Sequence, residues 1–166
     1  TQGVSSAASD VYKRQVLEDY YLEHIVLCLS DGLLAQCGID LDTHRGEIAA
    51  GNLSSLRGCP FVLGSAEDIG GRIGRGLLRS SGVSPVSKAT SENVETLLAL
   101  CEQGVGACFC PENLLHTALS PEQLAHLHIL PLCSEASYPI CFGYLSRSYP
   151  WSVLSEFIRI AREQTA

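Results

Sequence analysis

The sequence predicts an α/β fold in which parallel strands alternate with helices. The first observation is that short apolar runs typical of buried strands alternate with helix-like segments between residues 59 and 111. The second is that 46% of the 166 residues are hydrophobic, which is enough to form a core. The third is that no apolar run approaches the roughly 18 residues of a membrane span. The repeated order of strand, helix and strand therefore implies βαβ units with right-handed crossovers.

Two apolar runs predict the first buried strands. They are HIVLCLS at residues 24–30 and PFVL at residues 60–63, the second ending at Gly64 and Ser65. Residues 31–56 lie between them and are interrupted by Gly38, Gly46 and Gly51. Because glycine weakens both helices and strands, we expect this segment to be a connection with at most a little helix.

The next segment, EDIGGRIGRGLLRSSG, predicts an amphipathic helix. Ile69, Ile73 and Leu77 recur at intervals of four, with Leu78 beside them, and Gly82 follows as a stop signal. The GGRIG within it matches neither the dinucleotide fingerprint nor a phosphate-binding loop, so the glycines are better explained by close packing on the sheet.

Further strands and helices follow in the same alternation. SPVSKAT (residues 84–90) predicts a strand, and SENVETLLALCEQG predicts a helix with Ser91 as its N-cap and Gly104 after its end. VGACFCPE predicts a strand that ends at Pro111. SPEQ carries a capping-box pattern for a short helix, LHILPL and YPICFGYL predict two more strands, and PWSVLSEFIRIARE predicts a final helix.

Residues 1–15 are expected to be foreign to the natural protein. They show no apolar stripe and no alternating run. Read back into codons, Ser5 to Gln15 resembles without mismatch a transposase adapter that is used to prepare sequencing libraries. We therefore expect an adapter-derived tail over residues 1–15 and a natural chain that begins no earlier than Val16.

Eight cysteines raise the question of disulfides or metal sites. Most of them lie inside apolar runs, where a thiol behaves as a small buried hydrophobe, and no Cys-x-x-Cys pair occurs. We expect structural thiols in a reducing cytoplasm, with no metal and no cofactor. The net charge of −7 argues against binding of this segment to the phosphate backbone of a nucleic acid.

The order and spacing of these motifs resemble one family. PFVLGS, LLRSSGVSP, TSENVETLLALCEQGVGACFCPENLL, LHILPL and PICFGYL, with the terminal amphipathic helix, are similar to the effector-binding domain of LysR-type transcriptional regulators. The most specific part is SENVETLLALCEQGVGACFCPE, and the resemblance extends from about residue 20 to residue 163.

The resemblance implies a type II periplasmic-binding-protein-like fold of two Rossmann-like lobes, with the first lobe truncated. Residues 16–60 would be a remnant of the first lobe and a connection, residues 61–132 the second lobe, and residues 133–166 the return strand and helix of the first lobe. The run HIVLCLS would then belong to a sheet whose neighbouring strands are missing.

The resemblance also implies a function. The domain would bind a small-molecule effector in the cleft between the lobes, and the whole protein would be a homodimer or tetramer that binds DNA only through a winged helix-turn-helix missing from this chain. No enzyme activity and no membrane contact are implied.

Candidate effector-binding residues lie where strands turn into helices. In open α/β sheets, ligands collect at the carboxyl ends of strands, near helix N-termini that favour anions such as a carboxylate. Phe109 is a candidate for an apolar wall of the cleft. Because Glu92 is acidic, a basic or polar effector remains an alternative to a carboxylate. The candidate set is Gly64, Ser65, Ser91, Glu92, Asn93 and Phe109.

Two alternatives remain open at this stage. One is an enzyme with Cys108 or Cys110 as nucleophile and His116 or His126 as its base, which requires a thiol and an imidazole within hydrogen-bond reach. The other is a stand-alone solute-binding protein of the same fold.

Overall fold

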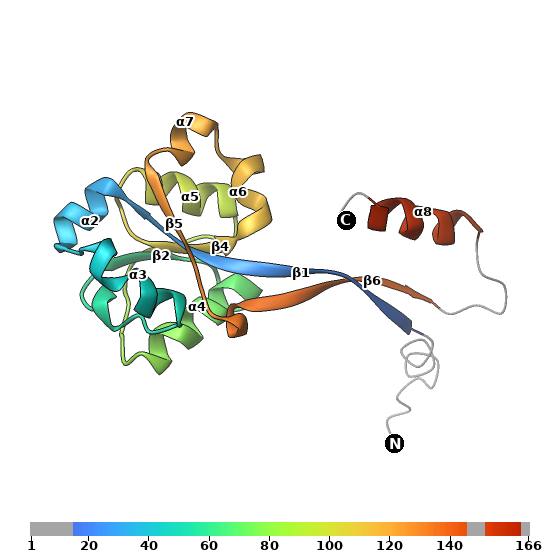
Figure 1. Cartoon of the computed structure of the whole chain (residues 1–166), viewed down its shortest axis with the longest axis horizontal. Helices are drawn as coiled ribbons and strands as arrows, with labels where there is room; N and C mark the ends of the chain where they lie inside the picture. The colour runs from blue at the N-terminus through green and yellow to red at the C-terminus, as the bar shows by residue number, and fades with distance from the viewer. Residues whose placement is uncertain (1–14, 146–151, 164–166) are drawn as a thin grey trace, which may run out of the picture. The chain divides into compact units, whose positions relative to one another are not determined.

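The computed structural model describes residues 15–145 and 152–163. Apart from Gln15, the segment attributed to a sequencing adapter lies outside the described residues. The chain forms two compact units (Figure 1): unit 1 comprises Thr1–Leu22 and Tyr138–Ala166, and unit 2 comprises Glu23–Ser137. Each unit is described by itself below.

The core of unit 2 is a sheet with β1 at its centre. β1 (Gln15–Ser30) pairs antiparallel with β4 (Cys108–Pro111) on one side and with β5 (Leu127–Pro131) on the other. β2 (Pro60–Leu63) and β3 (Val86–Thr90) pair in parallel. Ala107, directly before β4, exchanges hydrogen bonds with β2, since its N–H donates to the Pro60 carbonyl (2.8 Å) and its carbonyl accepts from the Val62 N–H (2.9 Å). The parallel βαβ arrangement predicted from the sequence is therefore confirmed for β2, β3 and the start of β4.

The placement of residues 24–30 differs from the expectation. Leu27 lies opposite Phe109 of β4 and opposite Leu130 of β5, so this stretch has partners on both sides. Ile25–Ser30 are all buried. The expectation that HIVLCLS lacks neighbouring strands is wrong, because this apolar run is part of a longer strand that pairs with both β4 and β5.

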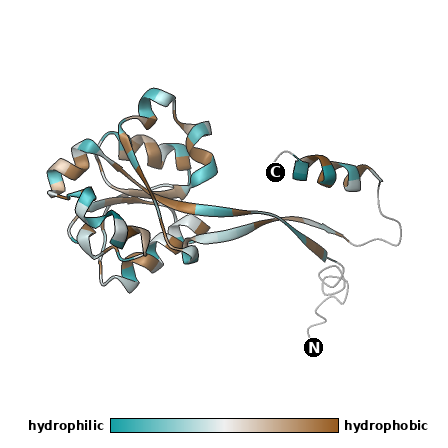
Figure 2. Cartoon of the chain, in the orientation of Figure 1, coloured by the Kyte–Doolittle hydropathy of each residue, from teal (hydrophilic) through white to brown (hydrophobic). Residues whose placement is uncertain are grey.

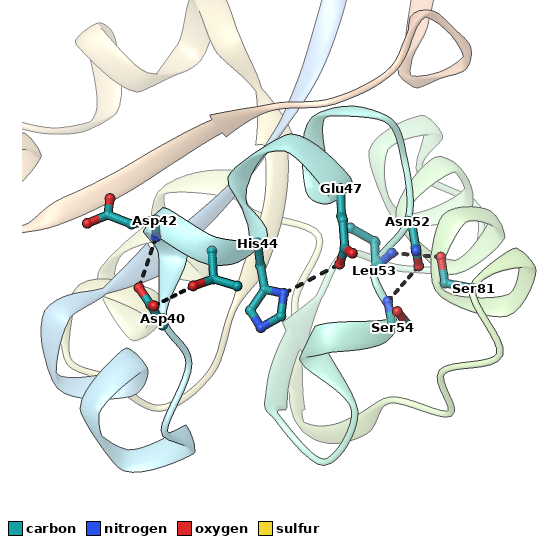
Figure 3. Close-up of polar contacts among 9 residues, drawn as sticks. Asp40, Asp42, His44, Glu47, Asn52, Leu53, Ser54 and Ser81 are labelled. Carbon is teal, nitrogen blue, oxygen red and sulfur yellow. Dashed lines mark hydrogen bonds and ion pairs between the residues drawn. The ribbon is translucent and has the colours of Figure 1, made fainter.

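Residues 31–56 also differ from the expected connection. They form α2 (Asp31–Cys37), α3 (Leu41–Ala49) and the short 3-10 helix η1 (Ser54–Leu56). Gly38 ends α2 in the left-handed conformation at φ 64°, so this glycine terminates a helix and does not prevent one. Asp40 caps α3, accepting from the Thr43 hydroxyl (2.6 Å) and the Asp42 N–H (3.1 Å), as Figure 3 shows. These two hydrogen bonds hold the pKa of Asp40 below its usual value, and the one from Thr43 has the larger effect.

Helices cover both faces of the sheet (Figure 1). α4 (Ile69–Ser80) lies on one face, and α5 (Val94–Glu102) and α6 (Glu112–Ala118) lie on the other. α7 (Pro121–Leu124) and η2 (Ser134–Ala136) complete unit 2. The predicted capping box of α7 is confirmed, since Ser120 accepts from the Gln123 N–H and the Gln123 side chain accepts from the Ser120 N–H.

The main core cluster lies between the sheet and α5 and α6. Figure 2 shows hydrophobic residues gathered along the central strands of unit 2. Cys108 and Cys110 share this face of β4, because side chains two residues apart on a strand point the same way, and both are fully buried. The thiols here behave as small core residues. The cluster consists of Val26, Cys28, Val62, Leu97, Leu98, Cys101, Cys108, Cys110, Leu115, Leu119 and Leu127.

On the opposite face, α4 approaches the sheet closely because it carries glycine. The Phe109 ring lies over Gly74, where an added Cβ would stand 2.3 Å from the ring. Phe109 also stacks on Phe61, with ring centroids 6.0 Å apart and planes within 5°. Gly74 therefore admits the aromatic pair that fills this side of the core.

Unit 1 combines the first part of β1 with β6 (Ser137–Leu145) and α8 (Ser152–Glu163). β6 pairs with β1. The Tyr20 hydroxyl donates to the Ala161 carbonyl of α8 (3.1 Å), and Phe142 contacts both Tyr20 and Phe157 through its ring. Among the described residues, the helices are all too short or too polar to cross a bilayer.

We expect Gly74→Ala to destabilise the fold and Gly76→Ala to stabilise it, although both lie in α4. A methyl group at residue 74 overlaps the Phe109 ring, which costs roughly 1–3 kcal/mol of overpacking. Residue 76 is exposed with open space around it, so alanine gains about 0.5–1 kcal/mol of helix propensity there. Urea unfolding of both variants measures the difference, and equal shifts of the two would contradict the packing described here.

Candidate functional site

The parallel strands β2 and β3 end at one edge of the sheet and bring the candidate residues together. Leu63 at the end of β2 lies opposite Thr90 at the end of β3. One residue further on, the Ser91 N–H donates to the Leu63 carbonyl (3.1 Å). Gly64 and Ser65 therefore follow β2 at the edge of the sheet where Ser91 follows β3, as expected for the carboxyl ends of neighbouring parallel strands.

The loop after β2 is tightly packed. An added Cβ at Gly64 would stand 2.9 Å from the Asp68 carboxyl group, so the backbone turns here with no room for a side chain. The Ser65 hydroxyl accepts from the Asp68 N–H (3.2 Å). The side chain of Ser65 is half-buried, so its position is defined while its hydroxyl stays within reach of the solvent.

Arg75 fixes the same loop from α4. Its guanidinium donates to the carbonyls of Gly64 (2.6 Å), Ser65 (3.1 Å) and Gly71 (3.1 Å). Hydrogen bonds from a charged donor contribute more than neutral ones. Arg75 thus turns the carbonyls of the loop inward and fixes the backbone on which Ser65 is carried.

The N-terminus of α4 is already occupied by a carboxyl group. Asp68 is the N-cap, and its Oδ2 accepts from the Gly71 N–H (2.8 Å). A negative side chain at this position satisfies the helix dipole that an anionic ligand would otherwise use. The first turn of α4 is therefore a poor site for a carboxylate effector.

The N-cap of α5 is Asn93, which corrects the prediction of Ser91. The Asn93 side chain accepts from the Thr96 N–H (2.9 Å). The Ser91 hydroxyl instead accepts from the Asn93 N–H (3.1 Å) and donates to the Asn93 carbonyl (3.4 Å), and Glu92 between them is exposed. The reason is that Ser91 still belongs to the β2–β3 ladder through its N–H.

Phe109 lies in the core. Its side chain is 4% exposed, and its ring is engaged with Phe61 and Gly74 inside the core. Gly64 and Ser65 thus follow one of two paired strands and Ser91 follows the other, with Glu92 and Asn93 next in the chain, while Phe109 packs in the core.

The thiols and histidines of the enzyme alternative do not form a catalytic pair. The sulfur of Cys110 contacts that of Cys28 (3.7 Å), and both side chains are fully buried. Hydrogen bonds from Cys108 and Cys28 lower the pKa of Cys110 to about 5, but a sulfur with no exposed surface is closed to substrates. His116 and His126, the proposed bases, are exposed.

The pKa of Cys108 changes in the opposite direction. Its interactions with Cys101, Cys110 and Cys28, together with burial, raise the pKa well above the usual value, so this thiol stays protonated at neutral pH. In the part of the chain that the structure describes, no three His, Cys, Asp or Glu side chains are grouped as metal ligands would be.

Two residues that hold this loop, Asp68 and Arg75, were not among the candidate site residues. Asp68 carried a signal, because an aspartate stands directly before the first apolar residue of the helix, where caps occur. Arg75 carried none, because its acceptors Gly64 and Ser65 lie eleven and ten residues away and meet it only after α4 has packed.

Comparison with known proteins gives one family and one fold. A family model described as the LysR substrate binding domain matches residues 16–166, a range that begins directly after the segment attributed to an adapter. No curated protein is similar enough in sequence to count as a relative.

Solved structures of LysR regulators share the fold at low identity. CbnR, solved at full length with its target DNA, is 17% identical with a TM-score of 0.56, over 90% of this chain and 48% of that one. The CcmR regulatory domain of Synechocystis PCC6803 in complex with 2-PG is 11% identical with a TM-score of 0.66, over 91% and 67%. The effector-binding domain of QuiR in complex with shikimate is 10% identical with a TM-score of 0.61, over 98% and 78%. The chain spans about half the length of the full-length regulators.

We expect Arg75→Met to destabilise the fold by about 1–3 kcal/mol, because three backbone carbonyls lose a charged donor. Arg72→Met, on the exposed side of the same helix, is the matched control and should stay within about 0.5 kcal/mol of the wild type. Chemical denaturation of the two variants provides the measurement. If both variants unfold at the same urea concentration, Arg75 does not support the loop.

We expect Asn93→Ala to cost about 1 kcal/mol of stability, the usual loss for a helix cap. Ser91→Ala should cost less than half of that, because its hydroxyl caps no helix and lies in an exposed turn. Thermal unfolding followed by circular dichroism distinguishes the two. A larger loss for Ser91→Ala would restore Ser91 as the cap.

Proposed function

The chain belongs to the LysR substrate-binding domain family, and from this premise we propose that it senses a small-molecule effector for a transcriptional regulator. The observation that carries the proposal is that Gly64 and Ser65 follow β2 at the same edge where Ser91 follows β3 and donates its N–H to Leu63. This edge is the place in an α/β sheet where ligands bind most often.

The chemistry of the edge indicates what the effector presents to it. Ser65 and Ser91 supply hydroxyl groups that both donate and accept hydrogen bonds. The carboxyl group of Asp68 occupies the first turn of α4, and Glu92 is exposed beside Ser91. A carboxylate of the effector would be repelled by both acids, so the proposed partner of this edge is a hydroxyl or amide group. A hydroxylated acid of the shikimate type meets this requirement if its hydroxyl groups face the serines.

For the whole protein, we propose that DNA is bound by a winged helix-turn-helix outside this chain. The regulator acts as a dimer or tetramer in the cytoplasm, and this domain catalyses no reaction. The net charge of −7 supports the proposal that this domain makes no contact with the phosphates of DNA.

A thermal-shift screen of the chain against carboxylic acids, amino acids and neutral polyols tests the sensing function. We expect at least one hydroxylated compound to raise the melting temperature in proportion to its concentration. Ser65→Ala and Ser91→Ala should each weaken its binding about tenfold, the effect of losing a hydrogen bond of roughly 1.4 kcal/mol.

Ser87→Ala is the matched control for these variants. Ser87 lies near the opposite end of β3, is exposed and contacts only the Ala89 carbonyl among the described hydrogen bonds of its side chain. The Ser87→Ala variant should bind the effector as tightly as the wild type does. Binding that is equally strong in all three variants would place the effector elsewhere, and a complete lack of response to every class of compound would count against sensing.

A further inference from the structure

Cys37 and Cys59 stand apart from the other thiols of unit 2. Their sulfur atoms are 3.5 Å apart, although 22 residues separate them in the chain. Cys59 is buried, with 1% of its surface exposed, whereas Cys37 is partly exposed. The four thiols of the core cluster have no exposed surface. Among the described cysteines, only Cys37 and Cys59 therefore combine closely spaced sulfur atoms with access from solvent.

The backbone holds both members of the pair in place. Cys37 is the last residue of α2, and Gly38 after it ends the helix with hydrogen bonds to Ala35 and Leu34. Cys59 donates its N–H to the Leu56 carbonyl (3.0 Å) and directly precedes β2. Because both positions are fixed, the short distance between the sulfurs is a property of the fold.

We propose that Cys37 and Cys59 form a dithiol site that small-molecule disulfides, such as oxidised glutathione, convert into an intramolecular disulfide. The site is independent of effector binding.

The exchange proceeds in two steps that balance. The Cys37 thiolate attacks one sulfur of oxidised glutathione, releases one glutathione thiolate and becomes a mixed disulfide. Cys59 then gives its proton to the released thiolate, and its sulfur attacks that of Cys37 and displaces the second glutathione. The second glutathione thiolate takes up from solvent the proton that Cys37 released when it formed its thiolate. The two protein thiols thus lose two electrons and two protons, and one glutathione disulfide is reduced to two thiols.

The order of the steps follows from the surroundings of each sulfur. Burial, followed by its interaction with Cys37, raises the pKa of Cys59, so Cys59 is a poor first nucleophile. Cys37 is the partly exposed member and can reach a molecule in solution. Cys59 then lies within reach of the sulfur that carries the leaving group.

The disulfide would close a loop that contains α3 and η1. This loop is already tied to the end of α4, because the Leu53 N–H donates to the Ser81 hydroxyl (2.8 Å), which itself donates to the Gly51 carbonyl (3.2 Å). Figure 3 shows Leu53 and Ser81 facing each other. The bond would therefore act on an ordered segment and restrict mainly the unfolded chain.

Equilibration of the chain in glutathione buffers of increasing oxidised fraction tests the proposal. Free thiols are blocked with iodoacetamide, and the protein is cut with trypsin and with a protease that cleaves before aspartate. Cys37 is then recovered in residues 31–39 and Cys59 in residues 58–67, each separated from every other cysteine. We expect the linked pair of these peptides, two hydrogens lighter than their sum, to be the first protein disulfide to form.

The thermal midpoint should rise with the linked fraction by roughly 5–10 °C, and dithiothreitol should reverse the rise. Cys37→Ala should abolish both the linked peptide and the temperature shift, while circular dichroism confirms that it folds. Cys133→Ala is the matched control, because Cys133 is also partly exposed, and it should retain both effects.

Three outcomes would overturn the proposal. The first is recovery of Cys37 only as a stable mixed disulfide with glutathione, which would show that Cys59 cannot attack it. The second is recovery of both thiols in alkylated form at every buffer composition. The third is a linked peptide that forms only when urea is present, which would assign it to the unfolded chain.

Discussion

The pairing of β1 with β4 and β5 is the constraint on which the rest of unit 2 depends. Val26–Cys28 is paired on both sides, with β4 and with β5, so this stretch divides the interior into two separately filled faces. Alternate residues of β4 then point to opposite layers, with Cys108 and Cys110 toward α5 and Phe109 toward α4. Because side chains alternate along a strand, a register shift of one residue would exchange these layers and place the Phe109 ring among the thiols.

The same sheet gives the candidate site its rigidity. Ala107 joins β4 to β2, and β2 fixes β3, so the edge that carries Ser65 and Ser91 is connected to the central strand through backbone hydrogen bonds. Arg75 adds a second attachment from α4. A binding edge held by both a sheet and a helix presents its hydroxyl groups in a defined geometry, which lowers the entropy lost when a ligand binds.

The sequence predicted most elements of the fold because each had a local signal, as the leucine-rich helix α5 and the capping box of α7 did. It missed α3 because only Leu41 and Ile48 of that helix are buried, seven residues apart, which is too sparse a pattern to recognise. It chose Ser91 over Asn93 as the cap because both residue types cap helices well. Which of the two caps α5 depends on the β2–β3 ladder, because the Ser91 N–H is hydrogen-bonded to Leu63. This contact joins segments about 28 residues apart, so local sequence patterns cannot contain it.

Glu23 shows how the central strand also orders the helices. Its side chain is only 3% exposed, and its Oε1 accepts from the backbone N–H of Asn113 (3.4 Å) and its Oε2 from the Asn113 side chain (3.3 Å). Asn113 lies in the first turn of α6, whose own N-cap, Pro111, offers no side-chain acceptor. A carboxyl group from β1 therefore takes the place of the missing cap. Because a buried carboxyl group without such donors would be costly, Glu23 couples the point where unit 2 begins to the start of α6.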